Sequence, residues 1–427
     1  MIKTRYVFIS VAALLLLGVG LLALPTIIRA LPGRYAYRLP EPLQALRHNP
    51  HPETLPTPAV VHTPALQPTK TATPLPTWTV TPSPSQTPTY VPPTLTPSST
   101  PTPSPTPPAS FTLTGLHHEH QGWNNCGPAT LAMALSFWDL NQTQHDVAPV
   151  LKPDPEDKNV SPWEMEQYAR DLGLGAIVRV NGTLETLKTL VRAGFPPIVE
   201  TWYVRDASDQ LGHYRLVVGY DDETQAFLTY DSLHGPDVVV DYQEMDELWR
   251  VFNRVYLVVY PFERWASLAA LIGDDVHDEQ MYEGALARAQ AEAASPPSTC
   301  VAYADCTDWV TFSCFNVGSS LTSLGRHEEA AAAYDQARQL GLHYRMLWYQ
   351  FGPYESYHGV GRHEDVIALA SATLKTAGNL EESYYWRGKS RLALDDVDGA
   401  RADFKSALRY HENWTPALDA LTGLQDP

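Results

Sequence analysis

Residues 121–130 read Gln121-Gly-Trp-Asn-Asn-Cys126-Gly-Pro-Ala-Thr130, which sets a glutamine five residues ahead of a cysteine. The residues after Cys126 have the apolar spacing of an amphipathic helix, so the cysteine is expected in its first turn. At that position the positive end of the helix dipole and free backbone N–H groups lower the pKa of a thiol. The stretch therefore predicts a nucleophilic cysteine that opens a helix from Cys126 to about Leu140.

Two later segments supply a base and a carboxylate for this thiol. His213 begins the apolar run His213-Tyr-Arg-Leu-Val-Val-Gly-Tyr220, which reads as a β-strand. Asp231 ends the next β-run, which begins at Ala226. Neighbouring strands would bring the imidazole and the carboxylate together. Cysteine, then histidine, then carboxylate is the order that this kind of thiol chemistry requires.

These residues resemble those of the double-glycine leader peptidases, the papain-fold cysteine peptidase domains of bacteriocin-exporting transporters, and above all their stand-alone relatives. The resemblance extends over residues 112–262. It implies that Cys126 is the nucleophile and that His213 is its general base. Asp231 would then orient the histidine, and the side-chain amide of Gln121 would belong to the oxyanion hole. The resemblance implies no metal and no organic cofactor, and it implies a peptide or protein substrate.

The sequence departs from the transporter-bound relatives in two respects. No Walker A loop and no multi-span membrane region follow the peptidase-like segment, so we do not expect cargo processing for an exporter of its own. Ser232 follows Asp231 where many relatives have proline. Structural roles remain as alternatives: a buried thiol at Cys126, a core histidine at His213 and a turn aspartate at Asp231.

Residues 111–263 are predicted to form a small α+β unit. Ser161-Pro-Trp-Glu164 has the cap, first-turn proline and reciprocal glutamate of a helix start, and this helix is expected to end near Gly173. The loop before His213, which contains Asp209 and Gln210, is expected to be solvated. Further helices are expected at 183–192 and 242–250, and strands at 177–180, 197–203, 213–220, 226–231, 236–240 and 254–260. Helices before a mostly antiparallel sheet are the papain-like order.

Residues 277–424 change to an alanine-rich helical pattern. The first group with tetratricopeptide-repeat spacing is Gly318, Leu321, Gly325, Ala330, Tyr334 and Ala337. A second group is Gly388, Ala400, Phe404 and Ala407. The turn positions Gly325, Gly361 and Asp395 lie 36 and 34 residues apart. We therefore expect an all-α tetratricopeptide-like domain of three stacked hairpins that offers a groove to a protein partner.

The first 110 residues read as an anchor and a stalk. Residues 6–24 form an uncharged run of the length that a bilayer-spanning helix requires, so residues 1–30 are expected to hold a transmembrane anchor. Residues 31–110 are rich in Thr-Pro and Ser-Pro repeats, which cannot bury enough surface to fold. We expect a single-pass membrane protein with extracytoplasmic domains. A protein secreted after signal cleavage and a cytosolic linker are the alternatives.

The net charge argues against some functions, and the four cysteines fall into two groups along the chain. The 427-residue chain has a formal net charge of -18, which argues against binding nucleic acid or anionic membranes through charge. Cys126 stands apart from Cys300, Cys306 and Cys314. On a continuous helix Cys306 and Cys314 would lie about 12 Å apart, too far for a disulfide. Cys300 and Cys306 are the predicted pair, with three unbridged thiols as the alternative.

The functional hypothesis is a membrane-anchored, extracytoplasmic cysteine peptidase with a Cys126–His213–Asp231 site and Gln121 in its oxyanion hole. Two alternatives remain: a catalytically silent scaffold that binds partners through its helical repeats, and a thiol acyltransferase. The run His117-His-Glu-His120 is not expected to bind a metal. Alternate residues of an extended segment face opposite sides, so at most two of its ligands converge.

Overall fold

The computed structural model describes 23–28, 54–58, 107–206, 209–302, 308–424 and the single positions 31, 35, 39, 40, 43 and 306. Nearly all of the predicted anchor run and most of the predicted stalk therefore lie outside the described residues. Within the described part of the chain, no helix combines the length and the hydropathy that a bilayer crossing requires.

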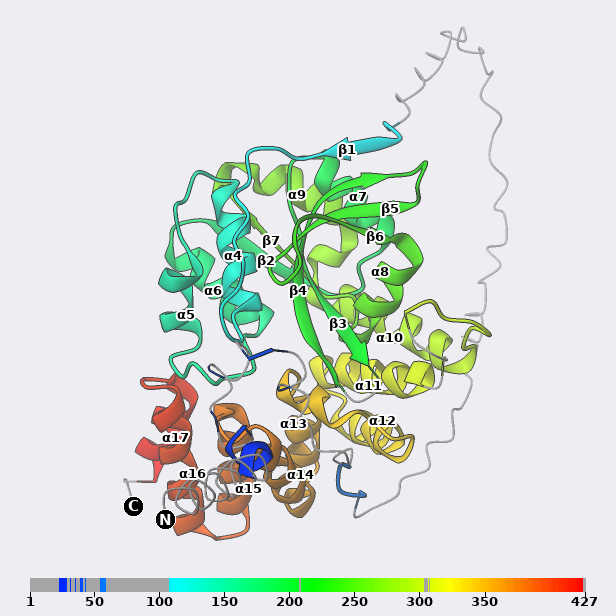
Figure 1. Ribbon diagram of the computed structural model, residues 1–427. Coiled ribbons are helices and arrows are strands. Elements are labelled where there is room, and N and C mark those ends of the chain that lie inside the picture. Colours follow the sequence, from blue (N-terminus) through cyan, green and yellow to red (C-terminus); the bar gives the residue numbers. More distant parts are fainter. Residues whose placement is uncertain are drawn as a thin grey trace, which may run out of the picture.

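The peptidase-like segment is built on one antiparallel sheet of seven strands (Figure 1). The strand order is β2 (Gly175–Arg179), β7 (Tyr256–Tyr260), β3 (Ile198–Asp206), β4 (Asp209–Asp221), β5 (Ala226–Asp231) and β6 (Gly235–Asp241), with β1 (Ser110–Thr112) paired to β4. The central strands β4 and β7 are buried over nearly their whole length. Such burial of successive residues occurs where both faces of a sheet are covered.

Helices cover both sides of this sheet. α4 (Cys126–Ser136) and α6 (Pro162–Asp171) pack on one side, and α7 (Leu184–Arg192) and α8 (Tyr242–Trp249) pack on the other (Figure 1). The predicted capping box is confirmed, because the Ser161 hydroxyl accepts from the Glu164 N–H while the Glu164 carboxylate accepts from the Ser161 N–H. The expected α+β order is thus observed.

One strand, two α-helices and one loop differ from the prediction. The sequence analysis missed β1, α5 (Gln144–Leu151) and α9 (Trp265–Ile272), although α5 has its own capping box at Thr143. Asp209 and Gln210 are each only 8% exposed and belong to β4, so the expectation of a solvated loop was wrong. The reason is Arg345, whose Nη1 lies 2.6 Å from Asp209 Oδ1 and donates to the Gln210 carbonyl oxygen at 2.9 Å.

A helical region follows the sheet and lies against the end of it where β3 and β4 meet (Figure 1). Successive helices pack on each other in sequence order, as expected for stacked hairpins. The elements after β6 are α8, η2 (Arg250–Phe252), β7, η3 (Phe262–Arg264), α9 (Trp265–Ile272), η4 (Gly273–Val276), α10 (Asp278–Ala294), α11 (Asp308–Ser323), α12 (His327–Gln339), η5 (Tyr344–Trp348), α13 (Gly352–Gly359), α14 (His363–Thr376), α15 (Glu381–Ala393), α16 (Val397–Tyr410) and α17 (Thr415–Gly423).

The repeat phase predicted from sequence agrees with the turns of this array. Gly325, Gly361 and Asp395 all have positive φ, at 71°, 75° and 63°, and each lies between two consecutive helices. Small residues let the helices approach closely. A Cβ at Gly388 would lie 2.7 Å from Cε1 of Phe404, so the aromatic ring occupies the space that glycine leaves.

The cysteines divide as the sequence predicted. Cys300 and Cys306 form a disulfide with a Cα–Cα distance of 5.6 Å. Cys126 and Cys314 are free thiols, and Cys314 is buried in α11. Cys126 is the only one of the two that is partly accessible.

Candidate active site

Cys126 is the first residue of α4, at the positive end of the helix. Asn125 occupies the N-cap position, yet its side chain makes no capping hydrogen bond. Its amide donates instead to Gln144 Oε1 at 3.0 Å. The N–H groups of the first turn are therefore not taken up by an N-cap side chain, and the thiol lies beside them.

His213 and Asp231 form a buried hydrogen-bonded pair. His213 Nε2 lies 2.9 Å from Asp231 Oδ1, and the two residues are 2% and 0% exposed. The adjacent strands β4 and β5 bring them together, as the sequence analysis expected. His213 also lies close enough to Cys126 for each of the two groups to shift the pKa of the other. Because Nε2 is hydrogen-bonded to Asp231, Nδ1 is the ring nitrogen left to interact with the thiol.

This arrangement favours an ion pair between thiolate and imidazolium. Burial raises the pKa of Cys126, but the hydrogen bond and charge of His213, with the N–H groups of Tyr214 and Gly127, lower it below its ordinary value. Burial lowers the pKa of His213, and its bonds to Asp231 and Cys126 raise it above its ordinary value. Both shifts favour the nucleophilic form of the sulfur.

Asp231 is held ionised by a set of converging donors. Its Oδ1 accepts from the N–H groups of Leu233 at 2.8 Å and His234 at 3.1 Å, in addition to His213. Its Oδ2 accepts from Arg215 Nε at 3.0 Å. Burial raises the pKa of Asp231, but the hydrogen bond and charge of His213 and the charge of Arg215 lower it far below the ordinary value.

Arg215 links the hydrogen bonds of Asp231 to the backbone of β4, the strand that carries His213. Its Nη1 donates to Thr201 Oγ1 at 2.9 Å, and that hydroxyl donates to the carbonyl oxygen of His213 at 3.0 Å. Asp231, Arg215 and Thr201 thus connect the imidazole of His213 to its own carbonyl group. The sequence analysis did not identify Arg215 or Thr201.

Gln121 is oriented by the residue that follows Asp231. The Ser232 hydroxyl donates to Gln121 Oε1 at 2.8 Å, and the Gln121 N–H donates to the Ser232 carbonyl oxygen at 2.8 Å. The amide carbonyl is thereby fixed, and the Nε2 donor of Gln121 is directed away from Ser232. A proline at this position could not do this, since it has no hydroxyl.

Gln144 in α5 organises the loop that joins Gln121 to Cys126. Its Oε1 accepts from the Gly122 N–H at 2.6 Å, and its Nε2 donates to Glu119 Oε1 at 2.8 Å and to the His120 carbonyl oxygen at 2.7 Å. Glu119 and His120 thus take part in loop structure. The group of three possible metal ligands that the described residues contain lies elsewhere in the chain.

The helical region contacts the hairpin that carries His213. A Cβ at Gly212 would meet Tyr349 Cε1 at 3.2 Å and Phe252 Cζ at 3.1 Å. Trp202 of β3 is fully buried, with ring centroids 5.5 Å from His343 and 6.4 Å from Tyr349. Together with the ion pair between Arg345 and Asp209, these contacts support the strand that carries the candidate base.

Comparisons with known proteins address the peptidase-like segment. Residues 113–257 match the model of the Peptidase_C39 like family. The chain is also similar to a crystal structure described as a C39-like peptidase from Bacillus anthracis, with 16% sequence identity and a TM-score of 0.30. That match covers 35% of this chain and 96% of the other. No curated protein matches the chain.

Proposed function

Because residues 113–257 form a peptidase C39-like domain, we propose that this protein is a cysteine peptidase that hydrolyses peptide bonds at Cys126. One observation carries the proposal: the thiol at the start of α4 has its pKa lowered by His213, which is itself hydrogen-bonded to the buried Asp231. A cysteine or histidine with a purely structural role does not require these linked interactions among thiol, imidazole and carboxylate. Peptide hydrolysis by acyl transfer requires them.

The reaction begins when the Cys126 thiolate attacks the carbonyl carbon of the scissile peptide bond. The Gln121 side-chain amide and the Cys126 backbone N–H stabilise the oxyanion that develops. Protonated His213 then gives its proton to the departing amine, and a thioester to Cys126 remains. Neutral His213 next removes a proton from water, whose oxygen attacks the thioester and releases the acid. Asp231 holds the imidazole in the required tautomer.

We also propose roles for the rest of the chain. The apolar run at 6–24 and the Pro/Thr-rich stretch after it support a membrane-anchored protein whose folded regions lie outside the cytoplasm. The repeat phase of Gly325, Gly361 and Asp395 supports a tetratricopeptide-like array at 277–424 that binds a protein partner. Protease added to intact cells should cut the Thr-Pro stretch and release a folded fragment. Protection of the chain until lysis would contradict the proposed location.

The experiment that tests the activity is digestion of a peptide library by the full chain, combined with labelling by a mechanism-based thiol probe. Cys126→Ala and His213→Ala are expected to abolish cleavage, whereas His145→Ala, at an exposed histidine, should leave it unchanged. Gln121→Ala should slow turnover by about a hundredfold while leaving probe labelling intact.

Other outcomes of this digest would contradict hydrolysis. Cleavage by Cys126→Ala equal to that of the wild type would exclude the proposed nucleophile. A wild type that transfers the acyl group to an added amine would indicate an acyltransferase. A wild type that cleaves nothing and binds a protein partner equally well with and without Cys126 would indicate a scaffold.

A further inference from the structure

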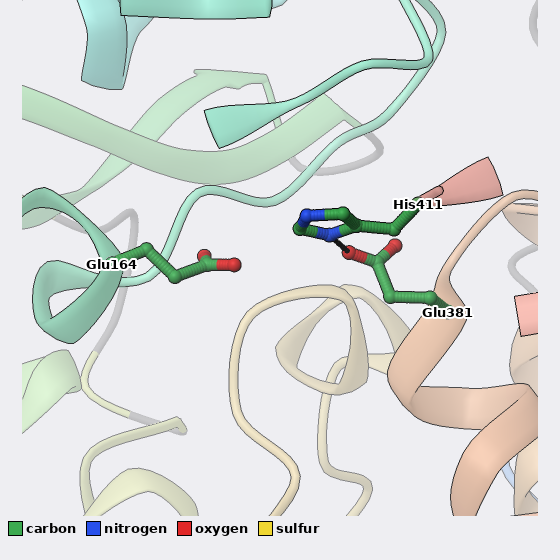
Figure 2. A group of neighbouring side chains, drawn as sticks. All are labelled: Glu164, Glu381 and His411. Atoms are coloured by element: carbon green, nitrogen blue, oxygen red, sulfur yellow. Dashed lines mark hydrogen bonds and ion pairs between the residues drawn. The ribbon is translucent and has the colours of Figure 1, made fainter. Parts of the chain in front are cut away.

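A second group of polar side chains lies where the peptidase-like domain meets the helical region, away from Cys126. Glu164 comes from α6, Glu381 begins α15, and His411 directly follows α16. One ligand atom from each of the three lies within 4.8 Å of the others. Figure 2 shows the carboxylate of Glu164 directed toward His411 and Glu381, whose side chains are hydrogen-bonded at 2.7 Å. Residues more than 200 positions apart thus converge.

The surroundings of this group are rich in buried acid. Asp157 and Glu381 are 4% and 3% exposed. Glu382 accepts from Asn159 Nδ2 through Oε1 at 3.1 Å, while its other oxygen, Oε2, is buried without a hydrogen-bond partner. Lys152 is the neighbouring cation, and its Nζ donates to backbone carbonyl oxygens, one of them that of Asp157. Among the described residues of this group, four carboxyl groups therefore accompany two side chains that can carry a positive charge, Lys152 and His411.

The hydrogen bonds of these carboxyl groups agree with a missing positive charge. Glu381 has His411 as a hydrogen-bond partner, and Oε2 of Glu382 has none. Buried acids that repel each other are stabilised either by protons or by a bound cation.

We propose that Glu164, Glu381 and His411 bind one divalent transition-metal ion, with Zn²⁺ as the best match, and that this ion cross-links the peptidase-like domain to the helical region. The donor set selects the class of ion, because imidazole suits Zn²⁺ whereas Ca²⁺ and Mg²⁺ prefer sites made of oxygen alone. Two carboxylates balance the charge of a divalent ion. Glu382, with its unpaired buried oxygen, is a further acid that could complete the coordination.

The spacing of the three ligands fits such an ion after the side chains close around it. Zn²⁺ lies about 2.0–2.2 Å from nitrogen and carboxylate ligands, so two of its ligands in tetrahedral geometry are about 3.3–3.6 Å apart. Separations of up to 4.8 Å therefore need to shorten by up to about 1.5 Å. Glu164 uses Oε2 to accept from Ser161 N–H in the cap of α6. Its Oε1 can bind the ion without loss of the cap.

The test is titration of the full chain, first stripped of metal, with ZnCl₂. The titration uses the Cys126→Ala background, because a thiol and an imidazole at the proposed active site would bind Zn²⁺ themselves. Calorimetry should give one Zn²⁺ per chain, and the thermal midpoint should rise with Zn²⁺ and not with Mg²⁺. Co²⁺ as a probe should give visible absorption bands that Zn²⁺ abolishes.

Three variants identify the ligands. Glu381→Gln and Glu164→Gln should each weaken Zn²⁺ binding by at least about tenfold and remove the thermal response. Glu412→Gln, at an exposed acid beside His411, is the matched control and should bind as the parent does. Because the glutamines also remove repulsion, the metal-free variants should be no less stable than the metal-free parent, which separates loss of a ligand from misfolding.

Three results would overturn the proposal. One is the absence of stoichiometric Zn²⁺ binding by the folded, metal-free chain. Another is binding that persists with unchanged affinity in both Glu381→Gln and Glu164→Gln. A preference for Ca²⁺ or Mg²⁺ over Zn²⁺ would likewise exclude His411 as a ligand. None of these measurements requires peptidase activity, so they stand apart from the test of the proposed function.

Discussion

Replacement of Asp231 by asparagine would disturb the site through the charge of Arg215. Asparagine has one acceptor oxygen where aspartate has two. If that oxygen takes the place of Oδ1, it keeps the three bonds from His213, Leu233 and His234, which lie at 2.9, 2.8 and 3.1 Å. The amide NH₂ then faces Arg215 Nε–H, and two donors oppose each other. In the reverse orientation the amide NH₂ faces the three donors of His213, Leu233 and His234, which is less favourable.

The magnitude follows from the burial of both partners. Asp231 is fully buried and the Arg215 side chain is 7% exposed, so the unpaired guanidinium cannot reach solvent. Loss of one partner of a buried ion pair costs about 3–5 kcal/mol of unfolding free energy. Arg215→Met added to Asp231→Asn removes the stranded charge. The double variant should therefore be more stable than the sum of the single effects by about 2 kcal/mol or more.

Urea unfolding of the full chain, followed by tryptophan fluorescence, would measure these free energies without a substrate. The pKa of Asp231 is lowered in the folded chain, so its contribution to stability is complete above the ordinary aspartate pKa and is lost as the pH falls. The cost of Asp231→Asn should therefore be nearly constant between pH 7 and pH 5 and shrink as the pH falls below about 4. A cost below about 1 kcal/mol at pH 7, or strict additivity in the double variant, would refute the reasoning.

Three further outcomes are expected. In His213→Ala, the charge that lowers the Cys126 pKa is gone, so the pH midpoint of iodoacetamide labelling should move upward, and an unchanged midpoint would contradict the ion pair. Ser232→Ala removes one hydrogen bond from Gln121, worth about 0.5–1.5 kcal/mol, and should slow turnover about two- to tenfold without changing the rate of labelling. Gly388→Leu should lower the unfolding free energy by about 1–3 kcal/mol in urea, because an aromatic ring of α16 fills the space; no change would contradict this packing.

The sequence predicted the location of a side chain wherever a local pattern of apolar residues determines the helix or strand that carries it. The apolar period after Cys126 predicts a helix that begins at the thiol, and the structure agrees. The β-runs predict that His213 and Asp231 lie on neighbouring strands. Arg215 was within reach of the same reasoning, because residues two apart on a strand share a face. It was missed because an arginine in a strand is ordinarily expected to face solvent.

Contacts between distant segments could not be predicted in this way. Gln144 binds a loop some 20 residues before it, and nothing in the pattern around it signals that contact. Helical periodicity predicts α15 and α16, yet it does not say how far the array curves back toward α6. The meeting of Glu164 with Glu381 and His411 depends on that curvature. For the same reason, Asp209 was expected in solvent although it is paired with Arg345.

Trp202 packs among aromatic rings of the helical region. This packing limits which segments of the protein could be exchanged by recombination. A recombination point after residue 257 would separate this fully buried indole from Phe312, His343 and Tyr349. The severed product would expose a tryptophan on the hairpin that carries His213. The two regions should therefore tolerate exchange only together, and substitutions around η5 should be limited by the strand against which that segment packs.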